Sequence, residues 1–266
     1  MLLRCLYDFA HSRKLLEDLA FAPKAIRWVM QLDSDGNLIG AGPIDTSEDG
    51  KRGKEFSAPI TSRPKVAGGI GEFLADGITA VFGLDPDPDK HKDNERKRRE
   101  RDANNLAKCE DFWRQIQQAA NETKHDALSA PLRFHEVLGQ QPSFLRWGVS
   151  KEPQVNEKSA WWLSTARGDE IKLRPDNFAF KVENLLLLED ETLRSWWREV
   201  YTQELGGRAE EAKRGLCLIT GRDDVPIAAT HPKIKGLKGA QPTGALLVSF
   251  DKPAFTSYGF DQSHNA

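Results

Sequence analysis

The first twenty residues place their apolar side chains at the spacing of an α-helix. These positions are Leu2, Leu3, Leu6, Phe9, Leu15, Leu16 and Leu19. Residues three or four apart lie on the same face of a helix, so the segment is predicted to form an amphipathic helix. Charged residues interrupt the apolar run, which therefore lacks the continuous apolar core of a signal peptide.

Residues 25–44 change to a period of two, which is typical of strands. Ile26, Trp28, Met30 and Leu32 alternate with other residues and precede an Asp-Gly turn at 34–37. Apolar alternation beside an Asp-Gly turn predicts a β-hairpin. A second hairpin is predicted over 159–175, with its turn at residues 167–169.

The rest of the chain contains segments with helical spacing and segments with the alternation of strands. A glycine-rich loop is predicted near residue 70, a short helix or strand over 73–82, and a helix from about 90 to 121. A further helix, 189–207, has acidic residues at its start and Gly206-Gly207 as its stop. Residues 215–221 and 244–250 are predicted as two buried strands.

The order of these elements predicts the fold class. Helices and strands interleave without a regular βαβ rhythm, so we expect an α+β protein with mixed small sheets rather than a doubly wound fold. Three regions are expected. They are a helix, hairpin and glycine-loop domain over 1–85, a mainly helical region with one hairpin over 86–205, and a strand-rich segment with a basic loop over 206–266.

Composition indicates a folded cytoplasmic protein. The chain has 266 residues, of which 39% are hydrophobic and 29% are charged, and its formal net charge is −2. Its three cysteines are far apart in the sequence, which fits a reducing compartment. No run of apolar residues is long enough for a membrane span, so no membrane partner is expected.

Catalytic and cofactor motifs are absent from the sequence. The segment GAQPTG at 239–244 has the first half of a phosphate-binding loop, but Ala245 and Leu246 replace the required Lys and Ser/Thr. The six histidines form no pair with metal-ligand spacing. His231 precedes Pro232 and is interpreted as a loop anchor rather than a catalytic group. We therefore expect no enzyme activity, metal or cofactor.

Two basic segments suggest contact with a polyanion. Residues 90–101 contain seven Lys or Arg against three acidic residues, a pattern also typical of a solvated helix face. Lys233, Lys235 and Lys238 lie beside Gly236 and Gly239, and no acidic residue occurs between 225 and 250. Glycine lets a backbone approach phosphates closely, and lysine adds a salt-dependent attraction. Taken alone, these features predict a nucleic-acid or phosphate binder.

The last fifty residues resemble the large subunit of the type I-C CRISPR Cascade complex. The matching positions are Cys217, Thr220 and Gly221; His231 to Gly236; Gly239 to Gln241 with Gly244 and Ala245; Ser249 and Phe250; Phe255 to Gly259; and Asn265 with Ala266. The segment 68–85 resembles the first domain of the family more loosely. It departs at Gly77, where the family often has Asn. Family members continue beyond this motif, so the chain is expected to be a truncated N-terminal part.

The resemblance implies a role without catalysis in RNA-guided defence. Such subunits read the protospacer-adjacent motif in duplex DNA, aid strand separation and help recruit the helicase–nuclease, while guide pairing supplies most of the sequence discrimination, as in other RNA-guided systems. The implied partners are target double-stranded DNA, the guide crRNA complex with the other Cascade subunits, the helicase–nuclease and phage-encoded anti-CRISPR inhibitors.

Two segments are the candidate nucleic-acid contacts. The first is the basic loop, comprising His231, Lys233, Lys235, Gly236, Lys238, Gly239 and Gln241. The second is the glycine-rich loop, comprising Arg63, Lys65, Gly68, Gly69, Ile70 and Gly71. Gln241 is included because glutamine pairs with adenine in the major groove, and contact with base edges in the minor groove is an equal alternative. Ile70 or Phe73 is a candidate wedge between base steps. Ordinary core packing is the alternative for both, and it is the favoured interpretation of Phe73.

Two alternatives to DNA reading remain. One is a metal-dependent nuclease that uses His231 with an acid such as Asp223 or Asp251. The other is a scaffold subunit whose basic loops hold guide RNA and neighbouring subunits instead of target DNA.

Overall fold

The computed structural model divides the chain into two compact units. One comprises Asp18–Thr202, and the other comprises Met1–Glu17 with Gln203–Ala266. The structure describes residues 2–13, 18–63, 68–90, 93–138, 142–151, 158–210, 214–217, 221–226, 238–239 and 245.

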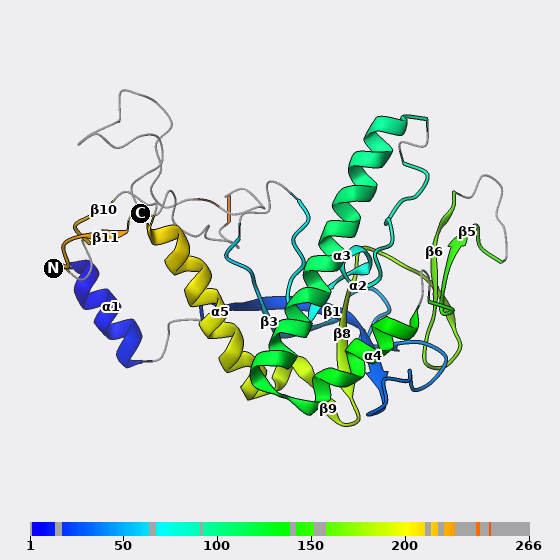
Figure 1. Ribbon diagram of the computed structural model, residues 1–266, viewed down its shortest axis with the longest axis horizontal. Coiled ribbons are helices and arrows are strands. Elements are labelled where there is room, and N and C mark those ends of the chain that lie inside the picture. Colours follow the sequence, from blue (N-terminus) through cyan, green and yellow to red (C-terminus); the bar gives the residue numbers. More distant parts are fainter. Residues whose placement is uncertain are drawn as a thin grey trace. The chain divides into compact units, whose positions relative to one another are not determined.

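A six-stranded sheet forms the centre of the larger unit (Figure 1). Strands β1 (Phe21–Leu32) and β8 (Asn177–Val182) pair in parallel, and the other four pair antiparallel to one of these two. On β1 these are β2 (Ile44–Asp45) and β3 (Lys54–Pro59), and on β8 they are β4 (Ala75–Gly77) and β9 (Leu185–Leu186). The sheet thus combines strands from both of the regions predicted as 1–85 and 86–205.

The parallel pair is buried because helices cover it. Phe178, Ala179 and Phe180 of β8 are fully buried, as a strand enclosed on both faces requires. The ring of Phe180 contacts Phe112 of α3 (Glu95–Thr123) and Phe134 of α4 (Ser129–Leu138), with ring centroids 6.5 and 6.3 Å apart. Helix α2 (Ile78–Phe82) packs on the same strand. These three helices therefore cover one face of the sheet.

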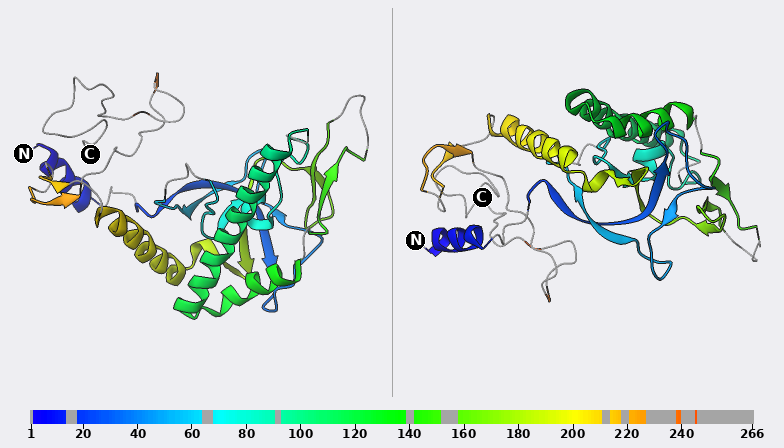
Figure 2. Two further views of the ribbon diagram at one scale, coloured as in Figure 1. Left: turned by 45° about the horizontal axis from the view of Figure 1, so that its top comes forward. Right: turned by 90° about the horizontal axis from the view of Figure 1, so that it is seen from below.

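A smaller three-stranded antiparallel sheet lies beside the central one. It consists of β5 (Leu145–Gly148), β6 (Ala160–Ser164) and β7 (Glu170–Lys172). Both views of Figure 2 place this sheet on the opposite side of the central strands from residues 191–202 of α5 (Glu191–Glu210). Short 3₁₀ turns, η2 (Asp126–Leu128) and η3 (Leu187–Glu189), precede α4 and α5.

The smaller unit contains few described elements. They are helix α1 (Leu2–Ser12) and the two-stranded pair β10 (Arg214–Gly215) and β11 (Val225–Pro226).

The fold confirms the α+β class and the hairpin over 159–175, whose strands are β6 and β7. The turn after β1 also forms, but its returning strand is only the two residues of β2. The first helix was predicted too long, because α1 ends at Ser12. The predicted stop at Gly206-Gly207 is wrong, since α5 continues to Glu210. A glycine inside a helix costs about 1 kcal/mol relative to alanine, which is too little to end a helix by itself.

The predicted C-terminal strands fall mostly outside the described residues. In the first, residues 215–217 and 221 are described, and among these only Gly215 belongs to a strand, while Leu216 is 57% exposed. In the second, only Ala245 is described.

Candidate nucleic-acid interface

The glycine-rich loop lies directly against helix α3. A Cβ atom added at Gly68 would lie 2.1 Å from Oδ1 of Asn104, and one added at Gly71 would lie 2.8 Å from Cβ of Phe112. Gly68 also has a φ of +70°, which disfavours other residues. The glycines are therefore required for close packing against α3, a reason for them that the sequence pattern did not reveal.

Asp111 of α3 holds this loop in place. The two terminal guanidinium nitrogens of Arg63 donate to its two carboxylate oxygens, each at 2.8 Å, and the Gly71 amide donates at 3.0 Å. Gln115 links the same groups by donating to the Gly71 carbonyl at 2.8 Å. Burial raises the pKa of Asp111, but the hydrogen bonds from Arg63, Arg114 and Gly71 outweigh burial and hold that pKa below its ordinary value.

The structure thus brings together Arg63, Gly68, Gly69, Ile70 and Gly71 in one loop. Ile70 is partly buried. Lys65, the remaining candidate of this loop, lies outside the described residues.

Phe73, the other wedge candidate, is a core residue. Its ring is fully buried between Trp196 and Trp197 of α5, with centroid distances of 5.0 and 5.1 Å. The packing interpretation of Phe73 is therefore confirmed.

Of the basic loop, only Lys238 and Gly239 are described. Both are exposed, Gly239 has a φ of +87°, and a Cβ atom added there would meet nothing within 4 Å. The side chain of Lys238 is open to solvent in the smaller unit. His231, Lys233, Lys235, Gly236 and Gln241 lie outside the described residues.

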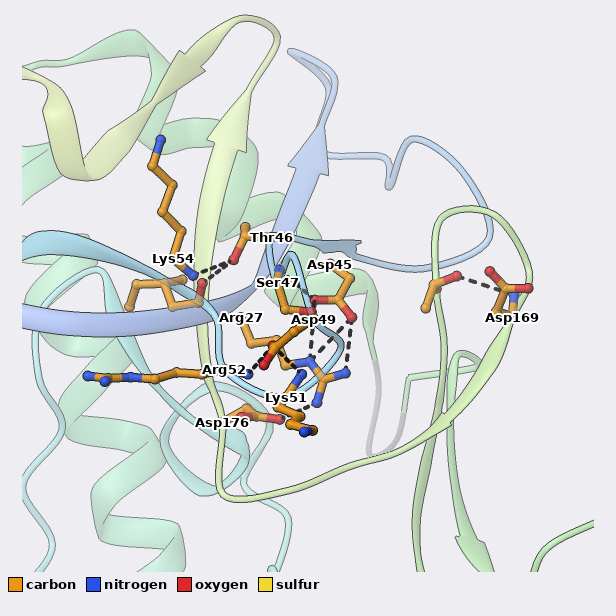
Figure 3. Close-up of polar contacts among 12 residues, drawn as sticks. Arg27, Asp45, Thr46, Ser47, Asp49, Lys51, Arg52, Lys54, Asp169 and Asp176 are labelled. Atoms are coloured by element: carbon orange, nitrogen blue, oxygen red, sulfur yellow. Dashed lines mark hydrogen bonds and ion pairs between the residues drawn. The ribbon is translucent and has the colours of Figure 1, made fainter.

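A buried arginine forms ion pairs with two carboxylates on the face of the central sheet opposite α3. Arg27 of β1 is 2% exposed and pairs with Asp45 at 3.0 Å and with Asp176 at 3.4 Å (Figure 3). Burial raises the pKa of Asp45, but hydrogen bonds from Arg27 and Ser47 reverse this and hold the pKa low. A buried cation needs such partners, so Arg27 fixes both carboxylates. Its second partner, Asp176, lies at the edge of the cleft described next.

A cleft of about 870 Å³ opens between the central sheet and the three-stranded sheet. One wall comprises Asp76 to Thr79, at the junction of β4 and α2, with the chain before β8. The facing wall includes Trp147 of β5 and Trp161 of β6, which are directly paired across the two strands. The volume is within the range of small-molecule sites.

The charged groups of the cleft fall into two classes. Lys108 is paired with Asp76 at 2.9 Å, and Asp176 with Arg27, so these groups are already neutralised. Five exposed side chains of the lining have no ion-pair partner among the described residues: Lys90, Lys158, Arg174, Asp87 and Asp89. The cations can attract an anion, and the carboxylates can accept hydrogen bonds.

The basic run predicted near residue 90 continues along α3. Asn94 caps the helix by accepting a hydrogen bond from the Lys97 amide at 3.1 Å. Arg96 pairs with Glu100 four residues on, which reduces the charge of the run. Lys97 and Arg98 are exposed and have no ion-pair partner within the part of the chain that the structure describes. The run is therefore a solvated helix face that retains free positive charge.

Cysteine and metal chemistry find little support in the described residues. All three cysteines are free thiols, and burial raises the pKa of Cys109 to about 11, so its thiol stays protonated and unreactive at neutral pH.

Within the described ranges, no three His, Cys, Asp or Glu side chains are grouped as metal ligands. Nor does this part of the chain contain a helix with the length and apolarity needed to cross a membrane.

Sequence reasoning did not find the cleft. Its residues come from segments near positions 77, 88, 108, 147, 160 and 175, which only the fold brings together. The one local signal is the pair of tryptophan-containing strands, since large aromatic side chains beside exposed cations are common in nucleic-acid sites.

Comparison with known proteins identifies the family. No curated protein matched the chain. The family model of the CRISPR-associated protein Cas_Csd1 matches residues 3–266, which is nearly the whole chain. The chain therefore belongs to the Cas_Csd1 family, the family of the large Cascade subunit of type I-C.

Proposed function

We propose that this chain is a DNA-recognition subunit, without catalytic activity, of the type I-C Cascade complex. In this role it reads the protospacer-adjacent motif in duplex DNA, aids strand separation and helps recruit the helicase–nuclease. The observation that carries the proposal is the family match over residues 3–266, because it makes the chain part of an RNA-guided complex. Guide pairing reads most of the target in RNA-guided systems, so a protein subunit is needed chiefly for the short motif and the backbone.

The basic loop is the proposed contact with the DNA backbone. Residues 225–250 contain no acidic residue, so nothing in that segment offsets Lys233, Lys235 and Lys238. Lys238 is exposed, as a phosphate contact requires. Each lysine that neutralises a phosphate of duplex DNA contributes about 0.9 to the slope of log affinity against log salt concentration.

The glycine-rich loop is the proposed second contact. The clamp formed by Asp111 fixes Arg63 and Gly71, and the neighbouring Ile70 is only partly buried. A preformed loop binds at lower entropic cost than a loop that must order on binding. Arg63 is committed to Asp111, so it acts here as a support of the loop rather than as a free phosphate ligand.

Duplex binding at several salt concentrations tests the proposal. Lys233→Ala with Lys235→Ala should weaken binding to all sequences and lower the salt slope by about 1.8. The matched control is Lys51→Ala with Lys172→Ala, because both of these lysines are exposed and neither belongs to a proposed contact. Equal binding by both double variants would remove the basic loop from the interface.

The same samples test the alternatives. Incubation of the chain with labelled DNA or RNA and magnesium or manganese should leave the nucleic acid intact. Cleavage that disappears in His231→Ala would establish the nuclease alternative instead. Tighter binding of crRNA than of duplex DNA would establish the scaffold alternative.

A further inference from the structure

Two tryptophans lie on one wall of the cleft between the two sheets. Trp147 and Trp161 oppose each other on β5 and β6, with ring centroids 5.5 Å apart and an interplanar angle of 59°. Trp161 is 6% exposed, and its indole nitrogen donates to the Asp85 carbonyl at 2.7 Å. Trp147 is only half-buried. Trp161 is thus held in place within the pair, and Trp147 is the ring with exposed surface that a ligand can contact.

The charges around these rings suit one class of ligand. Lys90, Lys158 and Arg174 are exposed cations of the lining without an ion-pair partner in the described part of the chain. Asp87 and Asp89 add two unpaired carboxylates to the same lining. Cations attract phosphate, whereas a carboxylate accepts hydrogen bonds from the amino group of a nucleobase. A ligand that carries an aromatic ring, amino groups and a phosphate satisfies all three features.

We propose that the cleft binds an unpaired nucleotide of a single nucleic-acid strand, with its base against Trp147 and its phosphates near Lys158 and Arg174. A base within a duplex has both faces covered by its neighbours, so only an unpaired base can stack on a side chain. A volume of about 870 Å³ is within the range of small-ligand sites and accommodates a nucleotide. This inference rests on the proposed function, because it adds a single-strand site to a subunit proposed to recognise duplex DNA.

Binding of a short fluorescent oligo-dC to the full chain, measured by anisotropy, tests the inference, because cytosine carries an amino group that a carboxylate of the cleft can accept a hydrogen bond from. Trp147→Ala removes one stacking contact. This variant should therefore bind the oligonucleotide about ten-fold more weakly than the wild type, which corresponds to about 1.4 kcal/mol. Trp147→Phe keeps an aromatic face and should lose less. The matched control is Trp162→Ala, since Trp162 neighbours Trp161 on β6 but does not line the cleft.

A second variant keeps the test decisive if Trp147→Ala does not fold. Lys158→Ala with Arg174→Ala changes only exposed side chains and should lower the salt slope for oligo-dC by about 1.4. A parallel measurement with oligo-rC determines whether the strand is DNA or RNA.

Three results would overturn the inference. They are no binding of either oligonucleotide, equal binding by wild type and the cleft variants, or an equal loss in Trp162→Ala. Failure here is distinguishable from failure of the proposed function, because the latter is measured with duplex DNA and the basic-loop variant. Duplex binding that depends on Lys233 and Lys235 would stand even if the cleft bound no single strand.

Discussion

Replacing Asp111 by alanine removes the carboxylate that binds Arg63 and Gly71 to α3. It leaves the Gly71 amide without its acceptor in a buried position, and it removes the ion pair between Arg63 and Asp111. A hydrogen bond to a charged group is worth about 1.5–3 kcal/mol, and a buried unsatisfied donor costs about 1–3 kcal/mol. The side chains of Arg63 and Asp111 are 24% and 12% exposed, so water offsets part of the loss. We expect the free energy of unfolding to fall by about 3 kcal/mol.

Urea denaturation followed by tryptophan fluorescence measures this loss. All seven tryptophans lie between residues 28 and 197, so the signal reports on the larger unit alone. The matched control is Glu100→Ala on the same helix, because its ion pair with Arg96 is 62% and 89% exposed. Exposed helix pairs are worth about 0.5 kcal/mol or less. A loss in Asp111→Ala no larger than in Glu100→Ala would refute the clamp.

Two further predictions concern single residues of the same unit. Burial against Trp113 lowers the pKa of His135 below 6.5, so the unfolded chain binds a proton more readily and stability should fall as the pH drops below about 6.5. His135→Phe should remove this part of the pH dependence of unfolding, and an unchanged profile would contradict the assignment. Gly71→Ala forces a contact with Phe112 and should cost about 1–3 kcal/mol in the same urea assay. Gly77→Ala, whose added Cβ would meet only the Asp176 carbonyl at 3.7 Å, should be nearly neutral, and equal losses in both variants would contradict the close packing.

The local pattern of the chain determined much of its secondary structure. The alternation of Ile26, Trp28, Met30 and Leu32 predicted a strand, and all four are fully buried in β1. The helix over about 90–121 and the hairpin over 159–175 were likewise predicted from periodicity and turn residues. These signals are local. A strand that packs on any core needs apolar residues at every second position, and a helix needs them three or four residues apart, whichever segments it packs against. The resemblance of the last fifty residues to the type I-C large subunit also required no structure, and the family match confirms it.

Only the tertiary structure decided which segments meet. The parallel pairing of Ile26 with Asn177 joins strands that are far apart in the sequence, and nothing near either strand specifies its partner. The same long-range packing turned the glycines of 68–71 towards α3, buried Phe73 beneath α5 and brought Trp147 and Arg174 to one cleft. Such contacts depend on the total burial of the folded chain rather than on the residues next in sequence. Periodicity therefore predicted the helices and strands, whereas the contacts between them, and the cleft that they line, depend on the tertiary fold.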